Sequence, residues 1–184
     1  MPDGVNDMTR FSRFIACALL AIALPVAAQD SKTAGDVVDD TWIHTKVKAN
    51  LATNQGGSVN IEVYHGYVQL AAFTTNPELK ERLPKLAAEI TGVKKVLNRI
   101  YVVESNRSAG TMLDDGVMST KVKSAVADGD LSRGIDVNVE VNRGVVLLSG
   151  FVDSTEQRDQ AIQLAGTVKG VKKVINGMDL KPAD

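Results

Sequence analysis

The chain has 184 residues, of which 44% are hydrophobic and 23% charged, and its formal net charge is −1. This composition is typical of a folded globular protein with one or two domains, and it excludes a disordered or fibrous chain. The nearly neutral charge also argues against a nucleic-acid-binding protein that relies on bulk positive charge.

The N-terminus has the pattern of a secretory signal peptide. A basic stretch, Met8–Arg13, precedes an apolar run, Phe14–Val26, and small residues end at Ala28. We expect a signal peptide at residues 1–28, cleaved after Ala28, which sends the mature chain to the periplasm. The alternative is a buried N-terminal helix. The run is shorter than the roughly 20 apolar residues of a membrane helix, so we expect no transmembrane segment in the mature chain.

Two smaller features of the N-terminus bear on the mature protein. The residues before Met8 are acidic, which makes Met8 an alternative start of the chain. Cys17 is the only cysteine and lies near the beginning of the apolar run, whereas a lipid-attachment cysteine ends such a run. We therefore expect a mature chain without disulfides, thiol catalysis or cysteine metal ligands.

The rest of the sequence consists of two copies of one unit. The segment "GVKKVLN" at Gly92 returns as "GVKKVIN" at Gly170, and "DDTWIHTKVKANL" at Asp39 returns as "DDGVMSTKVKSAV" at Asp114. The spacing is 75 residues for the earlier match and 78 for the later one, a difference of three residues in a loop between them. Self-similarity at such a long, nearly constant spacing indicates a duplicated structural unit. We predict domains at residues 36–104 and 112–181, joined by a polar linker at residues 105–111.

Each copy is expected to begin with a helix and continue into a hairpin. Apolar residues at a spacing of four predict the helix in both copies: Ile43, Val47 and Leu51, then Met118, Val122 and Val126. The acidic pairs Asp39/Asp40 and Asp114/Asp115 are predicted to cap its start. Alternating apolar residues then predict two strands, with Gly66 and Gly144 in the turns that join them.

A second helix and a last strand complete each copy. The helix is predicted to start at Asn76-Pro77 in the first copy and at Ser154 in the second, and Gly92 and Gly170 are predicted to close it in a left-handed C-cap. Pro84 should kink or shorten the first of these helices. We therefore predict an α+β fold of two tandem α-β-β-α-β units, each a three-stranded mixed sheet with two helices on one face.

The sheet faces away from these helices are more apolar than solvent exposure requires. They carry Tyr67 and Phe73 in the first copy, and Val145, Leu147 and Phe151 in the second. Because such small units have marginal cores, we expect these faces to pack on each other or on a protein partner.

Arranged in this way, the sequence resembles a tandem pair of BON domains, the bacterial OsmY and nodulation module. The resemblance rests on "IHTKVKANL" and "MSTKVKSAV", on "VNIEVYHGYVQLAAF" and "VNVEVNRGVVLLSGF", and on the two "GVKKV" segments. Such modules usually carry glycine where the second copy has Gly150, and Ala72 departs from this pattern. The resemblance implies a secreted, osmotically induced periplasmic protein without catalytic activity, whose modules bind phospholipid surfaces or other envelope components.

No pattern in the sequence indicates catalysis, a metal site or a cofactor. His44 and His65 lie in different predicted elements, and neither has a second histidine at metal-ligand spacing. The acidic pairs are explained by their expected place at helix starts. We therefore expect no enzyme activity, no metal, no cofactor and no nucleic-acid partner. The five glycines Gly66, Gly92, Gly144, Gly150 and Gly170 are interpreted as structural.

Basic residues and one tryptophan are the candidates for binding. Trp42 is interpreted either as a lipid-contact residue or as packed against its own core or the other copy. The lysines either contact an anionic membrane or form a solvated edge that prevents strand aggregation. The candidate lysines are Lys46, Lys94, Lys95, Lys121, Lys123, Lys169, Lys172 and Lys173.

Two functions are consistent with these observations. The first is a periplasmic, non-catalytic protein that binds anionic phospholipid or envelope proteins and supports envelope integrity under osmotic stress. The alternative is a periplasmic chaperone or adaptor whose apolar faces bind polypeptides.

Overall fold

The computed structural model describes residues 34–104, 108–129 and 137–183, with side chains from Asp39 onward in the first helix. The predicted signal peptide at residues 1–28, the cleavage after Ala28, the alternative start at Met8 and Cys17 lie outside the described residues.

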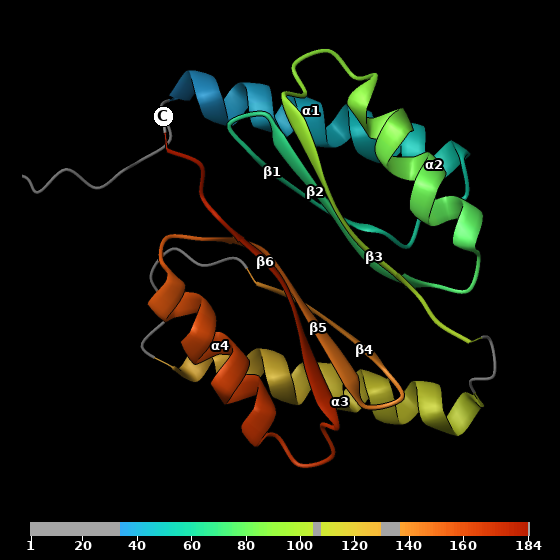
Figure 1. Cartoon of the computed structure of the whole chain (residues 1–184), viewed down its shortest axis with the longest axis vertical. Helices are drawn as coiled ribbons and strands as arrows, with labels where there is room; N and C mark the ends of the chain where they lie inside the picture. The colour runs from blue at the N-terminus through green and yellow to red at the C-terminus, as the bar shows by residue number, and fades with distance from the viewer. Residues whose placement is uncertain (1–33, 105–107, 130–136, 184) are drawn as a thin grey trace, which may run out of the picture. The chain divides into compact units, whose positions relative to one another are not determined.

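The two copies fold as equivalent units, here called module 1 and module 2 (Figure 1). Module 1 comprises α1 (Ala34–Thr53), β1 (Asn60–Tyr64), β2 (Tyr67–Thr74), α2 (Pro77–Ala88) and β3 (Lys95–Val102). Module 2 comprises α3 (Ala109–Asp128), β4 (Asn138–Asn142), β5 (Val145–Val152), α4 (Thr155–Thr167) and β6 (Lys173–Leu180). The predicted α+β order of elements is confirmed.

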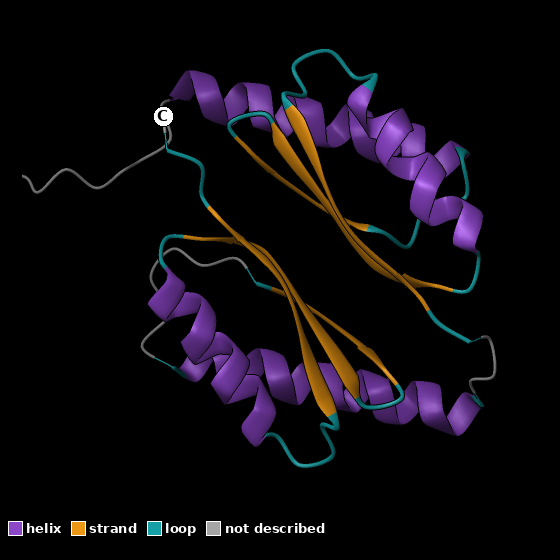
Figure 2. Ribbon diagram, viewed as in Figure 1, coloured by secondary structure: helices purple, strands orange, loops and turns teal. Residues whose placement is uncertain are grey.

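Each module contains one three-stranded mixed sheet. In module 1 the central strand β2 is antiparallel to β1 and parallel to β3, and β5 has the same relations to β4 and β6. The antiparallel pair is closed by a two-residue hairpin, whereas the parallel pair needs the crossover that α2 or α4 provides. Figure 2 shows the two helices of each module on one face of its own sheet.

A hydrophobic core fills the space between each sheet and its helices. In module 1, Val47 and Leu51 of α1 and Leu83 of α2 pack against Val68 and Leu70 of β2, all fully buried. In module 2, Val122, Val126 and Ala161 pack in the same way against Val146 and Leu148. The apolar residues that predicted the first helix of each copy therefore form its buried face.

The first helices start earlier than predicted, and the acidic pairs do not cap them. Ser108 caps α3, because its Oγ accepts a hydrogen bond from the N–H of Thr111 at 3.2 Å. The pair Asp114/Asp115 consequently lies inside α3, and Asp39/Asp40 lies inside α1. Helix α3 also includes the last residues of the segment expected as a linker.

Helix α2 continues through Pro84 and has 12 residues, against 13 in α4. Proline cannot donate the hydrogen bond that the carbonyl of Lys80, four residues earlier, would otherwise accept. The side chain of Asn98 on β3 supplies a donor instead, with Nδ2 2.9 Å from the Lys80 oxygen. The helix start was predicted correctly: Asn76 caps it and Pro77 is its first residue.

The sheet faces that carry no helices pack against each other, within one compact unit that contains both modules. Leu147 is 0% and Phe151 7% exposed. The ring of Phe151 lies 5.8 Å from that of Tyr64 in module 1. The expectation that the apolar outer faces contribute to packing between the copies is confirmed for these two residues.

Candidate functional site

Each first helix is joined to the hairpin turn of its own module by a buried carboxylate. Asp40 accepts hydrogen bonds from the backbone N–H groups of His65 at 2.8 Å and Gly66 at 2.9 Å. In module 2, Asp115 accepts them from Arg143 at 2.8 Å and Gly144 at 3.1 Å. Both aspartates are 5% exposed. They therefore stabilise the turns rather than the helix starts.

The hairpin turns have the backbone that such an arrangement requires. His65 and Gly66 have φ values of 49° and 82°, and Arg143 and Gly144 have 53° and 79°. Two consecutive residues with positive φ are typical of a type I′ turn, which matches the twist of the strands it joins. The buried carboxylate accepts hydrogen bonds from both N–H groups of each turn.

A second turn meets the hairpin in each module. The N–H of Lys94 donates to the Gly66 carbonyl at 2.8 Å, and that of Lys172 donates to the Gly144 carbonyl at 2.8 Å. A Cβ on Gly66 would lie 2.7 Å from the carbonyl oxygen of Gly92, so no larger residue fits without movement. We call this meeting of first helix, hairpin turn and second turn the turn junction of each module.

The prediction that Gly92 and Gly170 form the C-caps of the second helices is wrong, because both glycines lie in the second turn, beyond the helix end. Helix α2 ends at Ala88, and Gly92 is the third residue of a later turn, closed by a 3.1 Å bond from the N–H of Val93 to the carbonyl of Ile90. Gly170 has the same place after α4. Both glycines do adopt positive φ, 89° and 99°. The helix therefore ends before the glycine, and the turn leads the chain into the last strand beside the hairpin.

An open cavity lies at each turn junction. In module 1 its volume is about 330 Å³, and its lining includes Asp39, Trp42, His65 and Lys94. In module 2 the equivalent cavity is about 460 Å³, and its lining includes Thr111, Arg143 and Lys172. These cavities were not predicted from the sequence. The acidic pair and the glycine-lysine segment, which line them, are both repeated in the two copies, and this repetition could have indicated a shared site.

The turn junction of module 1 brings together three of the predicted binding residues. Trp42 is 46% exposed and lies outside the module's core cluster. The Nζ of Lys46, one helical turn further along α1, lies 5.7 Å from the centre of the Trp42 ring. Lys94 lines the same cavity as Trp42. An exposed aromatic ring with two cations near it is therefore presented at one end of module 1.

Module 2 presents aliphatic residues where module 1 has tryptophan. Val117 occupies the position of Trp42 and is 51% exposed, and the preceding turn of α3 exposes Met112 by 55% and Leu113 by 71%. Lys172 lines the adjacent cavity. Lys121 follows Val117 by one helical turn, whereas Lys123 projects from another side of the helix. The other predicted lysines are also exposed: Lys95, Lys121, Lys123, Lys169 and Lys173.

The two histidines lie in separate elements of module 1. His44 is on α1, whereas His65 is in the hairpin turn, where its ring stacks on Tyr64 at 4.4 Å. Within the described ranges, no group of three or more His, Cys, Asp or Glu residues is placed to hold a metal ion. Nor does the described part of the chain contain a helix with the length and hydropathy needed to cross a bilayer.

Comparison with known proteins gives consistent matches over both modules. The family model described as "BON domain" matches residues 39–104 and 114–182. The chain is 30% identical over 151 residues to the osmotically-inducible protein Y of Escherichia coli K12, covering 80% of this chain and 75% of that protein. It is 31% identical over 159 residues to the outer membrane lipoprotein DolP of Haemophilus influenzae, covering 84% and 81%.

Proposed function

The chain belongs to the BON-domain family, and from this premise we propose that it is a non-catalytic periplasmic protein that binds anionic phospholipid surfaces and supports envelope integrity under osmotic stress. The relatives support a role at the cell envelope under osmotic stress, because one is named for osmotic induction and another as an outer membrane lipoprotein. The observation that carries the proposal is the exposed ring of Trp42 with Lys46 and Lys94 at one turn junction.

These three side chains suit the interface of a bilayer. Tryptophan favours the headgroup region, where its ring is partly apolar and its indole N–H can still reach polar groups. Each lysine close to an anionic membrane contributes about 1 kcal/mol. Because the net charge of the chain is −1, attraction to such a surface must come from local groups of lysines. We therefore expect binding that is reversible and weakened by salt.

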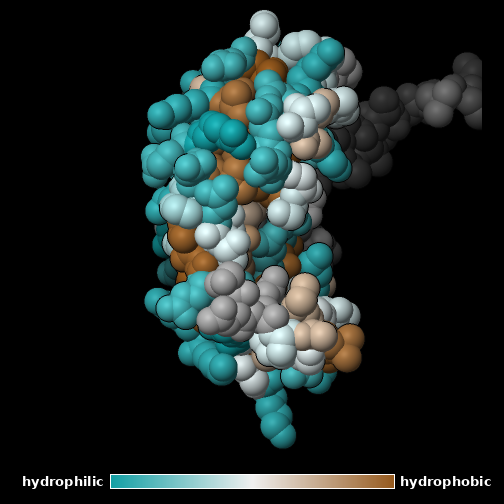
Figure 3. All heavy atoms as spheres, turned by 90° about the vertical axis from the view of Figure 1, so that its right-hand side faces the viewer, coloured by the Kyte–Doolittle hydropathy of each residue, from teal (hydrophilic) through white to brown (hydrophobic). Residues whose placement is uncertain are grey.

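Module 2 supplies a second contact of the same kind. Its exposed aliphatic residues Met112, Leu113 and Val117 have Lys121 and Lys172 nearby in the equivalent positions of Lys46 and Lys94. On the face shown in Figure 3, hydrophobic residues appear in separate groups among hydrophilic ones. Small apolar groups of this kind suit contact with a membrane surface rather than insertion across it.

Sedimentation with vesicles tests the proposal. We expect the mature protein to sediment with vesicles that contain phosphatidylglycerol at low salt, and to remain in solution with pure phosphatidylcholine. Replacing Trp42 with alanine and both Lys172 and Lys173 with serine should greatly reduce the bound fraction. The matched control replaces Lys48 and Lys85 with serine, because both side chains are exposed. These two substitutions remove as much positive charge as those of Lys172 and Lys173, but away from the turn junctions.

The outcomes separate clearly. Binding that is absent at low salt, or that is the same in the triple variant and in the wild type, contradicts the proposal. A loss in the Lys48/Lys85 control as large as the loss in the triple variant would also contradict it, because the effect would then depend on total charge alone.

A second function has support from the exposed apolar row Met112, Leu113 and Val117. Such a row can bind an unfolded or extended polypeptide, as a periplasmic chaperone or adaptor requires. Suppression of the aggregation of an unfolded client, together with no vesicle binding, would favour this function over the first.

A further inference from the structure

The contact between the modules is reciprocal at its edges. The Nδ2 of Asn60 donates to Oε1 of Glu140 at 3.0 Å, and the Nδ2 of Asn138 donates to Oε1 of Glu62 at 2.6 Å. Asn138 and Glu140 occupy the positions of Asn60 and Glu62 in the duplicated sequence. The modules thus make the same pair of bonds in both directions, as two identical subunits do across a two-fold axis.

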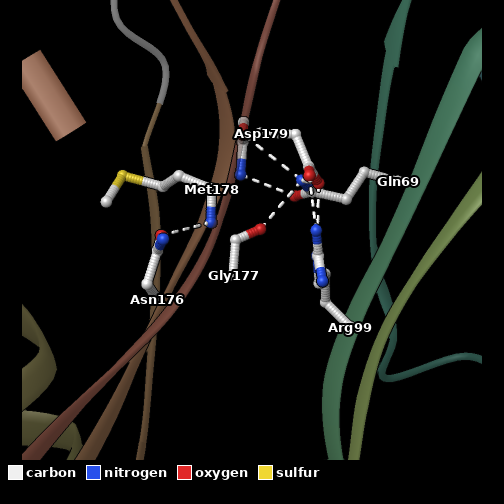
Figure 4. Close-up of polar contacts among 7 residues, drawn as sticks. Gln69, Arg99, Asn176, Gly177, Met178 and Asp179 are labelled. Atoms are coloured by element: carbon white, nitrogen blue, oxygen red, sulfur yellow. Dashed lines mark hydrogen bonds and ion pairs between the residues drawn. The ribbon is translucent and has the colours of Figure 1, made fainter. Parts of the chain in front are cut away.

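At the centre of the contact the two modules have different residues at equivalent positions, so the interactions are not reciprocal there. Gln69 of β2 is 1% exposed, and its position in module 2 is occupied by Leu147, which is 0% exposed. The Oε1 of Gln69 accepts a hydrogen bond from the N–H of Gly150 at 2.6 Å. Its Nε2 donates to the carbonyl of Gly177 at 2.9 Å (Figure 4). A leucine in place of Gln69 could satisfy neither backbone group.

Arg99 and Gly177, which occupy equivalent positions on β3 and β6, lie directly against each other. A Cβ built on Gly177 would lie 3.6 Å from the Cβ of Arg99 and 2.9 Å from Cδ1 of Leu147. The guanidinium of Arg99 pairs with the carboxylate of Asp179, with Nε 3.2 Å from Oδ2. This hydrogen bonding raises the pKa of Arg99. The position of Asp179 is occupied by Tyr101 in module 1.

We infer that the sheet face of module 1 is a recognition surface specific for module 2, and that Gln69, Arg99 and Gly177 make it reject a second copy of itself. Two facing copies of module 1 would bring Arg99 against Arg99, with a tyrosine where the carboxylate stands. Such an arrangement adds like-charge repulsion and a steric overlap.

Two facing copies of module 2 are also unfavourable. Leu147 would replace Gln69, so the N–H of Gly150 and the carbonyl of Gly177 would be buried without their partner, which costs free energy. Asp179 would face no arginine. Both like pairs are therefore disfavoured, and the duplicated modules select the mixed pair within one chain.

Cutting the folded chain between its modules tests this specificity. A protease site is inserted between Glu104 and Ser108, and two preparations carry different tags on module 1. After cleavage and mixing, capture of one tag should retain module 2 in equal amount and none of the differently tagged module 1. Dissociation of the unmodified halves at micromolar concentration, or capture of module 1 by module 1, overturns the inference.

Variants that reverse the charges of the ion pair between the modules test the same contact. Asp179→Arg places two arginines together and should raise the dissociation constant of the cut halves by at least about tenfold. Adding Arg99→Asp to it should recover much of the loss. The matched control is Asp159→Arg, because Asp159 is exposed and pairs with Arg158 of its own helix.

Hydrogen exchange in the uncut chain gives an independent measure. The N–H of Gly150 is bonded across the contact to Gln69, so Asp179→Arg should speed its exchange by about the same factor, while amides in the core of β5 stay protected. Unchanged association and unchanged exchange at Gly150 in Asp179→Arg would refute the assigned role of the pair. Vesicle binding is not needed for either result.

Discussion

Asp40 and Asp115 show how one side chain can position an entire hairpin. Each lies on a first helix and accepts the two backbone N–H groups of the turn in the same module. Their neighbours Asp39 and Asp114 are exposed. A buried N–H that loses its acceptor costs about 1–3 kcal/mol, so the members of each acidic pair should differ strongly in their effect on stability.

We predict that Asp40→Ala lowers the free energy of unfolding by about 2–4 kcal/mol, since two turn N–H groups lose their acceptor. Asp39→Ala should change it by less than about 0.5 kcal/mol, as is usual for surface substitutions. Urea unfolding followed by circular dichroism measures both. Equal effects of the two substitutions would show that the turn does not depend on the buried carboxylate.

The site could be predicted only in part at this scale. The sequence indicated that the acidic pairs, the glycines and Trp42 were special. It did not indicate which aspartate is buried, because the partner turn lies 25 residues further along the chain at His65. Gln69 could not be recognised either, since its acceptor and donor groups belong to the other module.

At the scale of elements, the spacing of apolar residues predicted the buried faces of the first helices. It did not predict the first turns of α3, where apolar side chains are exposed. The apolar spacing on α3 begins at Met118, but the helix begins at Ala109. The turns between them expose Met112, Leu113 and Val117, so no buried stripe marks them. Pro84 is the opposite case, since a local rule predicted a disruption that Asn98 of β3 compensates.

Pro84→Ala should stabilise the protein by about 1–3 kcal/mol, because alanine restores a main-chain donor within α2 and is the best helix former. Thermal and urea unfolding test this, with Lys85→Ala as the control for a neighbouring exposed residue. A loss of stability in Pro84→Ala would mean that the bond from Asn98 to Lys80 is part of a preferred geometry that the proline maintains.

At the scale of the whole molecule, duplication explains both the repeated sequence and the division of surfaces. The repeat predicted two modules with the same fold, and the first lysine of each "GVKKV" segment, Lys94 or Lys172, lines the cavity at its turn junction. The helix-free sheet faces are used for pairing between modules. The turn junctions line open cavities, and salt should weaken the membrane contact that we propose for them.

The most direct test of the proposed membrane contact uses Trp42, the only tryptophan in the chain. Its fluorescence can be followed while vesicles that contain phosphatidylglycerol and brominated lipid are added. We predict a shift of the emission to shorter wavelength and quenching by the brominated lipid, both reversed by high salt and both absent with phosphatidylcholine vesicles. Sedimentation of the protein with the anionic vesicles while the Trp42 emission stays unshifted and unquenched would contradict the account.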